Sequence, residues 1–163
     1  MYLLDTSVIS QLRGARAGRC DPGLAAWAAG VPRHDLFLSA LSLLELQNEA
    51  RQTARTDKGA ASALGEWIAT RVVTAFDGRI LPVDVAVIRR ADVLAYATSR
   101  DALLVATALE HRLTLVTQHV SAYKLGKPKL FNPWGYVPED EGEDWRQAAR
   151  GGSQWFKTLF LRA

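Results

Sequence analysis

The chain opens with Met1-Tyr-Leu-Leu-Asp-Thr-Ser-Val-Ile-Ser10, and this stretch sets the expectation for the fold. Residues 2–4 form a short apolar run that is typical of a buried strand. Asp5 ends that run, and a helix is predicted over residues 6–13 directly after it. A strand that passes at once into a helix is the first half of a βαβ unit, so a parallel sheet is expected.

The same alternation of apolar runs and helical segments continues along the chain. Strands are predicted over residues 2–4, 36–38, 79–82, 113–116 and 129–131. Helices are predicted near residues 6–13, 22–30, 39–55, 58–74, 85–97 and 101–111. This order predicts an α/β fold in which a parallel sheet is flanked by helices. Ligand sites in such sheets lie beyond the carboxyl ends of the strands, and Asp5 follows one of these ends.

Three carboxylates stand in short apolar segments where an acid is unexpected. Besides Asp5, they are Glu45, within the leucine-rich segment 39–46, and Asp101, which begins the alanine-rich segment 101–110. Ionised acids are rarely buried without partners, because their desolvation costs several kcal/mol. If the three acids converge in the fold they require cations, and a divalent metal ion is the simplest supply.

Each acid also has an ordinary structural explanation. Asp5 and Asp101 both stand before helical segments, where an aspartate accepts hydrogen bonds from free backbone N–H groups. Glu45 then lies on a solvated helix face. For any one acid this explanation is favoured, so the functional interpretation rests on the three acids together and on the sequence around them.

That surrounding sequence resembles the PIN-domain family, specifically the VapC- and FitB-like toxins of bacterial type II toxin–antitoxin pairs. The matching segments follow one order along the chain, at residues 3–10, 38–46, 101–109, 113–117 and 131–134. The resemblance implies a PIN-like fold over residues 1–134. It also implies metal-dependent cleavage of RNA, in a pocket where Asp5, Glu45 and Asp101 bind Mg²⁺ or Mn²⁺.

The implied reaction is hydrolysis of a phosphodiester in RNA. Metal ions held by the three acids would activate a water and neutralise charge on the phosphate and the leaving oxygen. Thr6 and Ser7 are expected to orient Asp5 or a metal-bound water, and Thr117 to do likewise from the end of its strand. For each hydroxyl a plain capping role has equal weight. The implied partners are the RNA substrate, an antitoxin protein and a second copy of the chain in a homodimer.

The sequence departs from the family pattern after Thr117. His119 stands where relatives usually carry a fourth acid or an asparagine, and Ala122 stands where many carry a further acid. A neutral imidazole suits Mn²⁺ better than Mg²⁺, so His119 is a candidate metal ligand. The favoured alternative is that His119 only lines the pocket or faces water. The missing acid also leaves open a second function, a catalytically impaired protein that binds partners in an antitoxin–DNA complex.

The segment before Asp101 is a second departure. Residues 89–100 run almost directly into this acid, whereas most relatives have a longer connection. A short connection leaves the mouth of the pocket more open or repositions Asp101. Asp92 and Arg100 are close enough in sequence to pair with Asp101 or to compete with it.

Residues 135–163 extend past the usual end of the family and are the third departure. The acidic run 139–144 predicts a solvated link, and positions 155, 156, 159 and 160 then form an apolar helical face. This amphipathic segment is expected to dock on the body, a second subunit or a partner. One hypothesis is that it covers a groove otherwise used by an antitoxin and directs Arg146 or Arg150 toward the acids. Simple filling of a hydrophobic gap is the favoured alternative.

Charge and composition are compatible with a nucleic-acid substrate. The formal net charge is +3, and because residues 139–163 hold five acids and four basic residues, the rest of the chain carries +4. Basic clusters that contain Arg13, Arg51 and Lys124 are candidates to bind RNA phosphates, with a solvated surface as an equal alternative. The single Cys20, the strand-like N-terminus and the lack of a long apolar run predict a cytoplasmic bacterial protein without a membrane segment.

Overall fold

A computed structural model describes residues 1–137, apart from the side chain of Arg16, and residues 159–160. Within this part of the chain the strands form one parallel sheet in the order β3-β2-β1-β4-β5. Their bounds are Tyr2–Leu4 for β1, Leu36–Ser39 for β2, Ile80–Leu81 for β3, Thr114–Val116 for β4 and Lys129–Phe131 for β5. The predicted α/β fold with a parallel sheet is confirmed, and the predicted strand near residues 79–82 shortens to two residues.

The order of the strands reverses between β1 and β4. From β1 the chain builds β2 and β3 on one side, then crosses over to build β4 and β5 on the other. Asp5 follows β1, and its N–H donates to the Val116 carbonyl of β4 at 3.0 Å. Thr117 follows β4. Both residues therefore lie at a topological switch point, which is where open α/β sheets commonly bind ligands.

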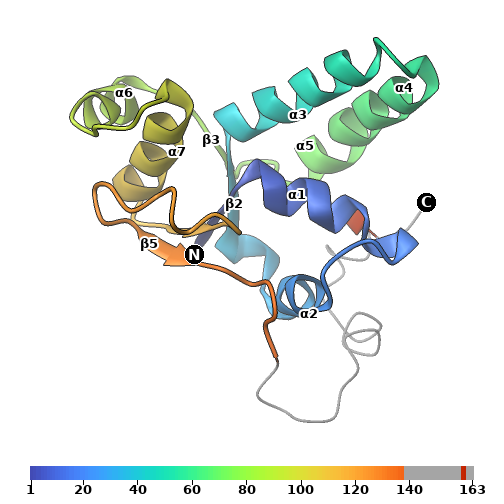
Figure 1. The fold of residues 1–163 in the computed structure, drawn as a ribbon, viewed down its shortest axis with the longest axis horizontal. Helices are drawn as coiled ribbons and strands as arrows, with labels where there is room; N and C mark the ends of the chain where they lie inside the picture. The colour runs from blue at the N-terminus through green and yellow to red at the C-terminus, as the bar shows by residue number, and fades with distance from the viewer. Residues whose placement is uncertain (138–158, 161–163) are drawn as a thin grey trace.

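The helices divide into two groups beside the sheet. Their bounds are Thr6–Arg13 for α1, Pro22–Gly30 for α2, Ala40–Thr53 for α3, Lys58–Trp67 for α4, Val73–Ala75 for α5, Val85–Asp92 for α6 and Ser99–Glu110 for α7. Figure 1 shows α6 and α7 on one side of the molecule and α3, α4 and α5 on the other, with the start of α1 between them. Among the described residues, no helix has both the length and the apolar character needed to cross a bilayer.

Some predicted helix boundaries are wrong because hydrogen bonds in turns and with distant segments override the apolar pattern. The predicted helix near residues 85–97 ends at Asp92, and tight turns follow in which the Tyr96 N–H donates to the Leu94 carbonyl at 2.8 Å. The Tyr96 hydroxyl anchors these turns by donating to the Leu125 carbonyl at 2.9 Å. Over residues 58–74 a π-helical turn, Ile68–Val72, separates α4 from α5. The predicted helix near residues 39–55 ends at Thr53.

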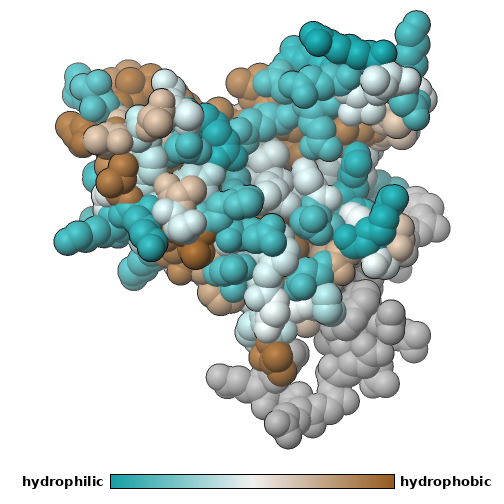
Figure 2. Space-filling model, in the orientation of Figure 1, coloured by the Kyte–Doolittle hydropathy of each residue, from teal (hydrophilic) through white to brown (hydrophobic). Residues whose placement is uncertain are grey.

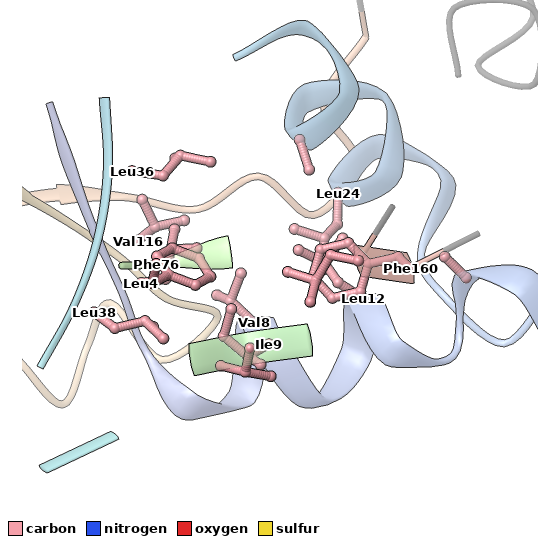
Figure 3. Close-up of a cluster of buried hydrophobic side chains, with 14 of the residues drawn as sticks. Leu4, Val8, Ile9, Leu12, Leu24, Leu36, Leu38, Phe76, Val116 and Phe160 are labelled. Atoms are coloured by element: carbon pink, nitrogen blue, oxygen red, sulfur yellow. The ribbon is translucent and has the colours of Figure 1, made fainter. Parts of the chain in front are cut away.

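The larger apolar cluster joins the sheet to α1, α2 and the α4–α5 segment, and it includes Leu159 and Phe160 (Figure 3). The Trp67 indole N–H donates to the Leu159 carbonyl at 3.2 Å, and the rings of Trp67 and Phe160 lie 6.3 Å apart. The extension therefore docks on the body at these two residues. Docking on the body was one of the three alternatives predicted from the sequence, beside a second subunit and a partner. Trp155, Phe156, the two arginines and the acidic run of the extension lie outside the described residues, and the boundary between residues 134 and 135 stays a prediction.

Candidate active site

Asp5 is held at the end of β1 by hydroxyl groups. Its side chain is buried, and its Oδ2 accepts hydrogen bonds from Thr117 Oγ1 at 2.9 Å and Ser7 Oγ at 3.2 Å. Asp5 occupies the N-cap position of α1, yet its side chain makes no capping hydrogen bond. A capping role is therefore wrong for this carboxylate. The predicted orienting contacts of Ser7 and Thr117 with Asp5 are present.

Glu45 reaches the same region from the second turn of α3. Ser39 begins this helix by accepting from the Leu41 N–H at 3.2 Å, and the buried Leu46 fixes which face of the helix meets the core. Thr6 donates a hydrogen bond to Glu45 Oε2. Thr6 thus orients Glu45, whereas the sequence suggested Asp5. The Glu45 side chain is only 24% exposed, so the solvated-face explanation is wrong.

Asp101 is the third residue of α7, and Thr98 is the residue that caps this helix. Thr98 Oγ1 accepts from the Asp101 N–H at 3.1 Å and donates to Asp101 Oδ2 at 2.7 Å. Burial alone would raise the pKa of Asp101, but the hydrogen bonds from Thr98 and Arg100 outweigh it and lower the pKa. Asp101 therefore stays ionised, and the prediction that it begins its helix is wrong by two residues.

Arg100 joins all three acids through one guanidinium. Its Nη2 lies 2.9 Å from Asp5 Oδ1, its Nε lies 2.5 Å from Glu45 Oε1, and its Nη1 lies 2.9 Å from Asp101 Oδ1. Burial works against the charge of Arg100, yet the hydrogen bonds to Glu45 and Asp101 and the charge of Asp5 raise its pKa. The sequence indicated only that Arg100 could pair or compete with Asp101, and it missed the contacts with the other two acids.

Tyr123 also contacts the guanidinium of Arg100. Arg100 Nη1 donates to its hydroxyl, and the Arg100 Cζ lies 6.0 Å from the centre of its ring. Tyr123 is buried in the cluster between β4 and α7. Burial and the charge of Asp5 raise the pKa of Tyr123 to about 12. No motif in the sequence pointed to this residue, since a tyrosine after a strand is ordinary core composition.

The other predicted residues lie outside this group. His119 is exposed, and its backbone N–H donates to Thr117 Oγ1 at 3.1 Å. Arg13 lies over the ring of Trp67 at 5.8 Å, Arg51 Nη2 donates to Asn48 Oδ1 at 2.5 Å, and Lys124 is exposed. The structure brings Asp5, Glu45, Asp101, Thr6, Ser7 and Thr117 together. His119 does not join their carboxylates.

The site lies between the two groups of helices. In Figure 1 the first turn of α7 faces the first turns of α1 and α3 across the centre of the molecule, and Figure 2 shows the surface hollowed between the α6–α7 arm and the α3–α4 arm. Carboxylate oxygens are the ligands that Mg²⁺ prefers. However, within residues 1–137 and 159–160 no three acidic, histidine or cysteine side chains are arranged to hold a metal ion. In this arrangement the three carboxylates are paired with the Arg100 guanidinium and do not form a ready metal-binding group.

Comparison with known proteins agrees with this fold. Residues 2–125 match the PIN domain, which is most of the chain. The chain belongs to the PIN-domain family. The match includes all three acids, the strands β1 to β4, and the helices α3 and α7 that carry Glu45 and Asp101.

Individual members of the PIN-domain family are similar to this chain over most or part of its length. Toxin FitB of Neisseria gonorrhoeae is 33% identical over 144 residues, which span 82% of this chain and 99% of FitB. Ribonuclease VapC14 of Mycobacterium tuberculosis is 36% identical over 75 residues, or 46% of this chain and 70% of that protein. A solved structure of FitAB bound to an IR36 DNA fragment superposes with a TM-score of 0.73 at 26% identity, over 86% of this chain and 100% of the matched one.

Proposed function

We propose that this PIN-domain protein is a metal-dependent ribonuclease and acts as the toxin of a toxin–antitoxin pair. The observation that carries the proposal is the meeting of Asp5, Glu45 and Asp101, from three separate segments, at the switch point of the sheet. Similarity to a toxin and to a ribonuclease supports the assignment. The proposed cofactor is Mg²⁺ or Mn²⁺, because the three carboxylates, once released from Arg100, offer the oxygen ligands that suit hard cations.

The supporting residues have distinct proposed roles. Ser7 and Thr117 fix the direction of Asp5, and Thr6 fixes that of Glu45. The proposed binding partners of the RNA backbone are basic side chains, for which Arg13, Arg51 and Lys124 are the candidates. The proposed partners are RNA, an antitoxin protein and a second copy of the chain, and the proposed location is the bacterial cytoplasm.

The proposal is tested by RNA cleavage with the purified chain, free of any partner, in the presence of Mg²⁺ or Mn²⁺. We expect cleavage that a chelator abolishes, and a loss of more than about a hundredfold for Asp5→Asn, which keeps the size of the side chain but removes its charge. The matched control is Asp77→Asn, an exposed acid outside the site, which should cleave at the wild-type rate.

A second candidate function is a catalytically impaired PIN protein that acts through binding to an antitoxin and DNA. Two observations favour it: His119 stands apart from the carboxylates, and Arg100 occupies the space between them. The FitAB structure is also bound to DNA. Absence of cleavage with either metal, from folded protein with and without residues 139–163, would support this function and contradict the first.

A further inference from the structure

Arg100 pairs with three carboxylates at once, whereas an ordinary surface ion pair joins one acid and one base. All three nitrogens of its guanidinium contact a carboxylate, and Nη2 makes a second contact, at 3.3 Å, with Glu45 Oε2. Guanidinium donors are arranged in a rigid fork that matches carboxylates, so these contacts fix the position of the side chain. The space between Asp5, Glu45 and Asp101 is thereby filled by a cation from the same chain.

The neighbours of Arg100 explain why it points into the site. It is the second residue of α7, and Thr98 sets the direction of this first turn. Side chains in a first helical turn project toward the N-terminal end of the helix, which here faces Asp5 and Glu45. Tyr123 adds a contact to the guanidinium through its hydroxyl, and its ring lies nearby.

The charge of the site remains unbalanced. Three carboxylates face one guanidinium, so two negative charges are left for a further cation to neutralise. The Arg100 side chain is 35% exposed, which gives it a path out toward solvent. A divalent ion at these acids would need the same carboxylate oxygens that Arg100 now contacts.

We propose that Arg100 is a built-in competitor that occupies the carboxylate site and must swing out before Mg²⁺ or Mn²⁺ binds. The inference rests on the proposed function, because it takes the acids to be the metal ligands. The protein then has a latched state, with Arg100 among the acids, and an open state that binds metal. When the binding-competent state is a minor fraction of the molecules, the apparent metal affinity falls by that fraction.

The test is Mn²⁺ binding to the full-length chain, measured by calorimetry or by electron paramagnetic resonance, so that it does not depend on catalysis. Arg100→Gln should bind Mn²⁺ at least about tenfold more tightly than wild type, as expected if the open state is about a tenth of the molecules. Arg90→Gln is the matched control. It removes one arginine charge and breaks the 2.7 Å pair with Glu110, away from the acids, and its affinity should not change.

Two further variants separate occupancy of the site from simple charge. Arg100→Lys keeps the positive charge but lacks the fork that reaches three carboxylates, so it should bind Mn²⁺ more tightly than wild type. Tyr123→Phe removes the supporting hydroxyl and leaves Arg100 and the acids intact, so it should move the affinity in the same direction by a smaller factor. These two variants also serve if Arg100→Gln does not fold.

Movement of the side chain has its own measurement. With ¹⁵N-labelled arginine, the Nε–H signal of Arg100 is assigned by its loss in Arg100→Gln. It should be protected from exchange without metal and lose that protection when Mg²⁺ is added. A signal that stays protected at saturating Mg²⁺ would overturn the proposal, because Arg100 and the metal would then bind together.

The binding results also distinguish failure of this inference from failure of the proposed function. If Arg100→Gln and Arg100→Lys bind Mn²⁺ no more tightly than wild type, Arg100 does not compete with the metal, but the metal site itself is retained. No Mn²⁺ binding by any of these proteins would overturn both the competitor and the metal-dependent nuclease. Tighter binding that Asp5→Asn abolishes in the Arg100→Gln background would establish the competition at these acids.

Discussion

The two ends of α1 lie in opposite environments, one polar and charged and the other apolar. At its first turn, Thr6 and Ser7 meet carboxylates that only one guanidinium balances. At its last turn, Leu12 packs in the apolar cluster that contains Leu159 and Phe160. Figure 3 draws Phe160 close to Leu12 in this cluster. One helix thus links the candidate active site to the place where the extension docks.

The difference separates residues that stabilise the fold from residues that serve the site. Each apolar side chain removed from water contributes favourably, at about 25 cal/mol per Å² of buried area. A partly buried group of three acids and one arginine contributes little, because desolvation offsets the attraction between the charges. The first turn of α1 is therefore better explained by chemistry than by stability, and substitutions at the two ends should have different signatures.

Phe160→Ala should produce the largest change in stability. Phe160 is 4% exposed, and truncating a buried phenylalanine costs about 3–5 kcal/mol of unfolding free energy. The measurement is denaturant unfolding of the full-length chain. Leu159→Ala, at a residue 3% exposed, and Leu44→Ala, at a residue 47% exposed, form a matched pair. If both leucine variants lose the same stability, the extension does not dock as described.

Arg100→Gln should have the next largest effect on stability, at the opposite end of α1. Without the guanidinium, three carboxylates face one another unpaired, and because the site is partly exposed the expected loss is about 1–3 kcal/mol in metal-free buffer. Mg²⁺ should restore part of this loss, since a ligand that binds only the native state stabilises it. Thermal unfolding with and without Mg²⁺ measures both effects. A variant as stable as wild type in metal-free buffer would show that the ion pairs do not contribute.

Thr117→Val tests the hydroxyl that orients Asp5. The side chains are similar in size, so the change removes the 2.9 Å hydrogen bond to a buried carboxylate at a cost of about 1–2 kcal/mol. RNA cleavage should fall as well, because Asp5 loses one of its two hydroxyl donors. Thr107→Val is the control: Thr107 is equally buried, but its hydroxyl donates to the Leu103 carbonyl within α7. Equal losses of cleavage in both variants would contradict a special role for Thr117.

Tyr123→Phe should change the unfolding free energy least at neutral pH, but it should change the dependence of that free energy on pH in the alkaline range. Its folded-state pKa of about 12 lies above the ~10 of an unfolded tyrosine. The associated stability is therefore complete below about pH 10 and is lost as the pH rises toward 12. Unfolding free energies measured across this range should fall more steeply for wild type than for Tyr123→Phe. Identical slopes would mean that Tyr123 titrates as an ordinary exposed tyrosine.

The parts of this structure that the sequence predicted are those set by local pattern. The apolar run 2–4 followed by Asp5 predicted β1 and α1, and Ser39 predicted the start of α3. The end of α6 was not predictable, because the turns after Asp92 depend on Tyr96 reaching the Leu125 carbonyl, a contact far along the chain. A helical pattern does not contain that information.

The candidate site was predictable in composition but not in arrangement. Asp5, Glu45 and Asp101 stood out because acids are unusual in apolar segments, and their meeting follows from the parallel sheet. The direction of the Arg100 side chain depends on the short link between α6 and α7 and on the support of Tyr123. These are tertiary features, so the sequence identified a possible competitor of Asp101 without indicating that it reaches all three acids.

Arg100 and Asp101 are consecutive residues of one helical turn, and this covalent connection changes how inhibition depends on protein concentration. A separate inhibitory protein leaves its target when the complex is diluted or when the inhibitor is degraded. A competing side chain stays at a fixed, high effective concentration whatever the concentration of the protein. The level of free divalent cation, rather than the abundance of the chain, would then determine how many molecules have an accessible carboxylate site.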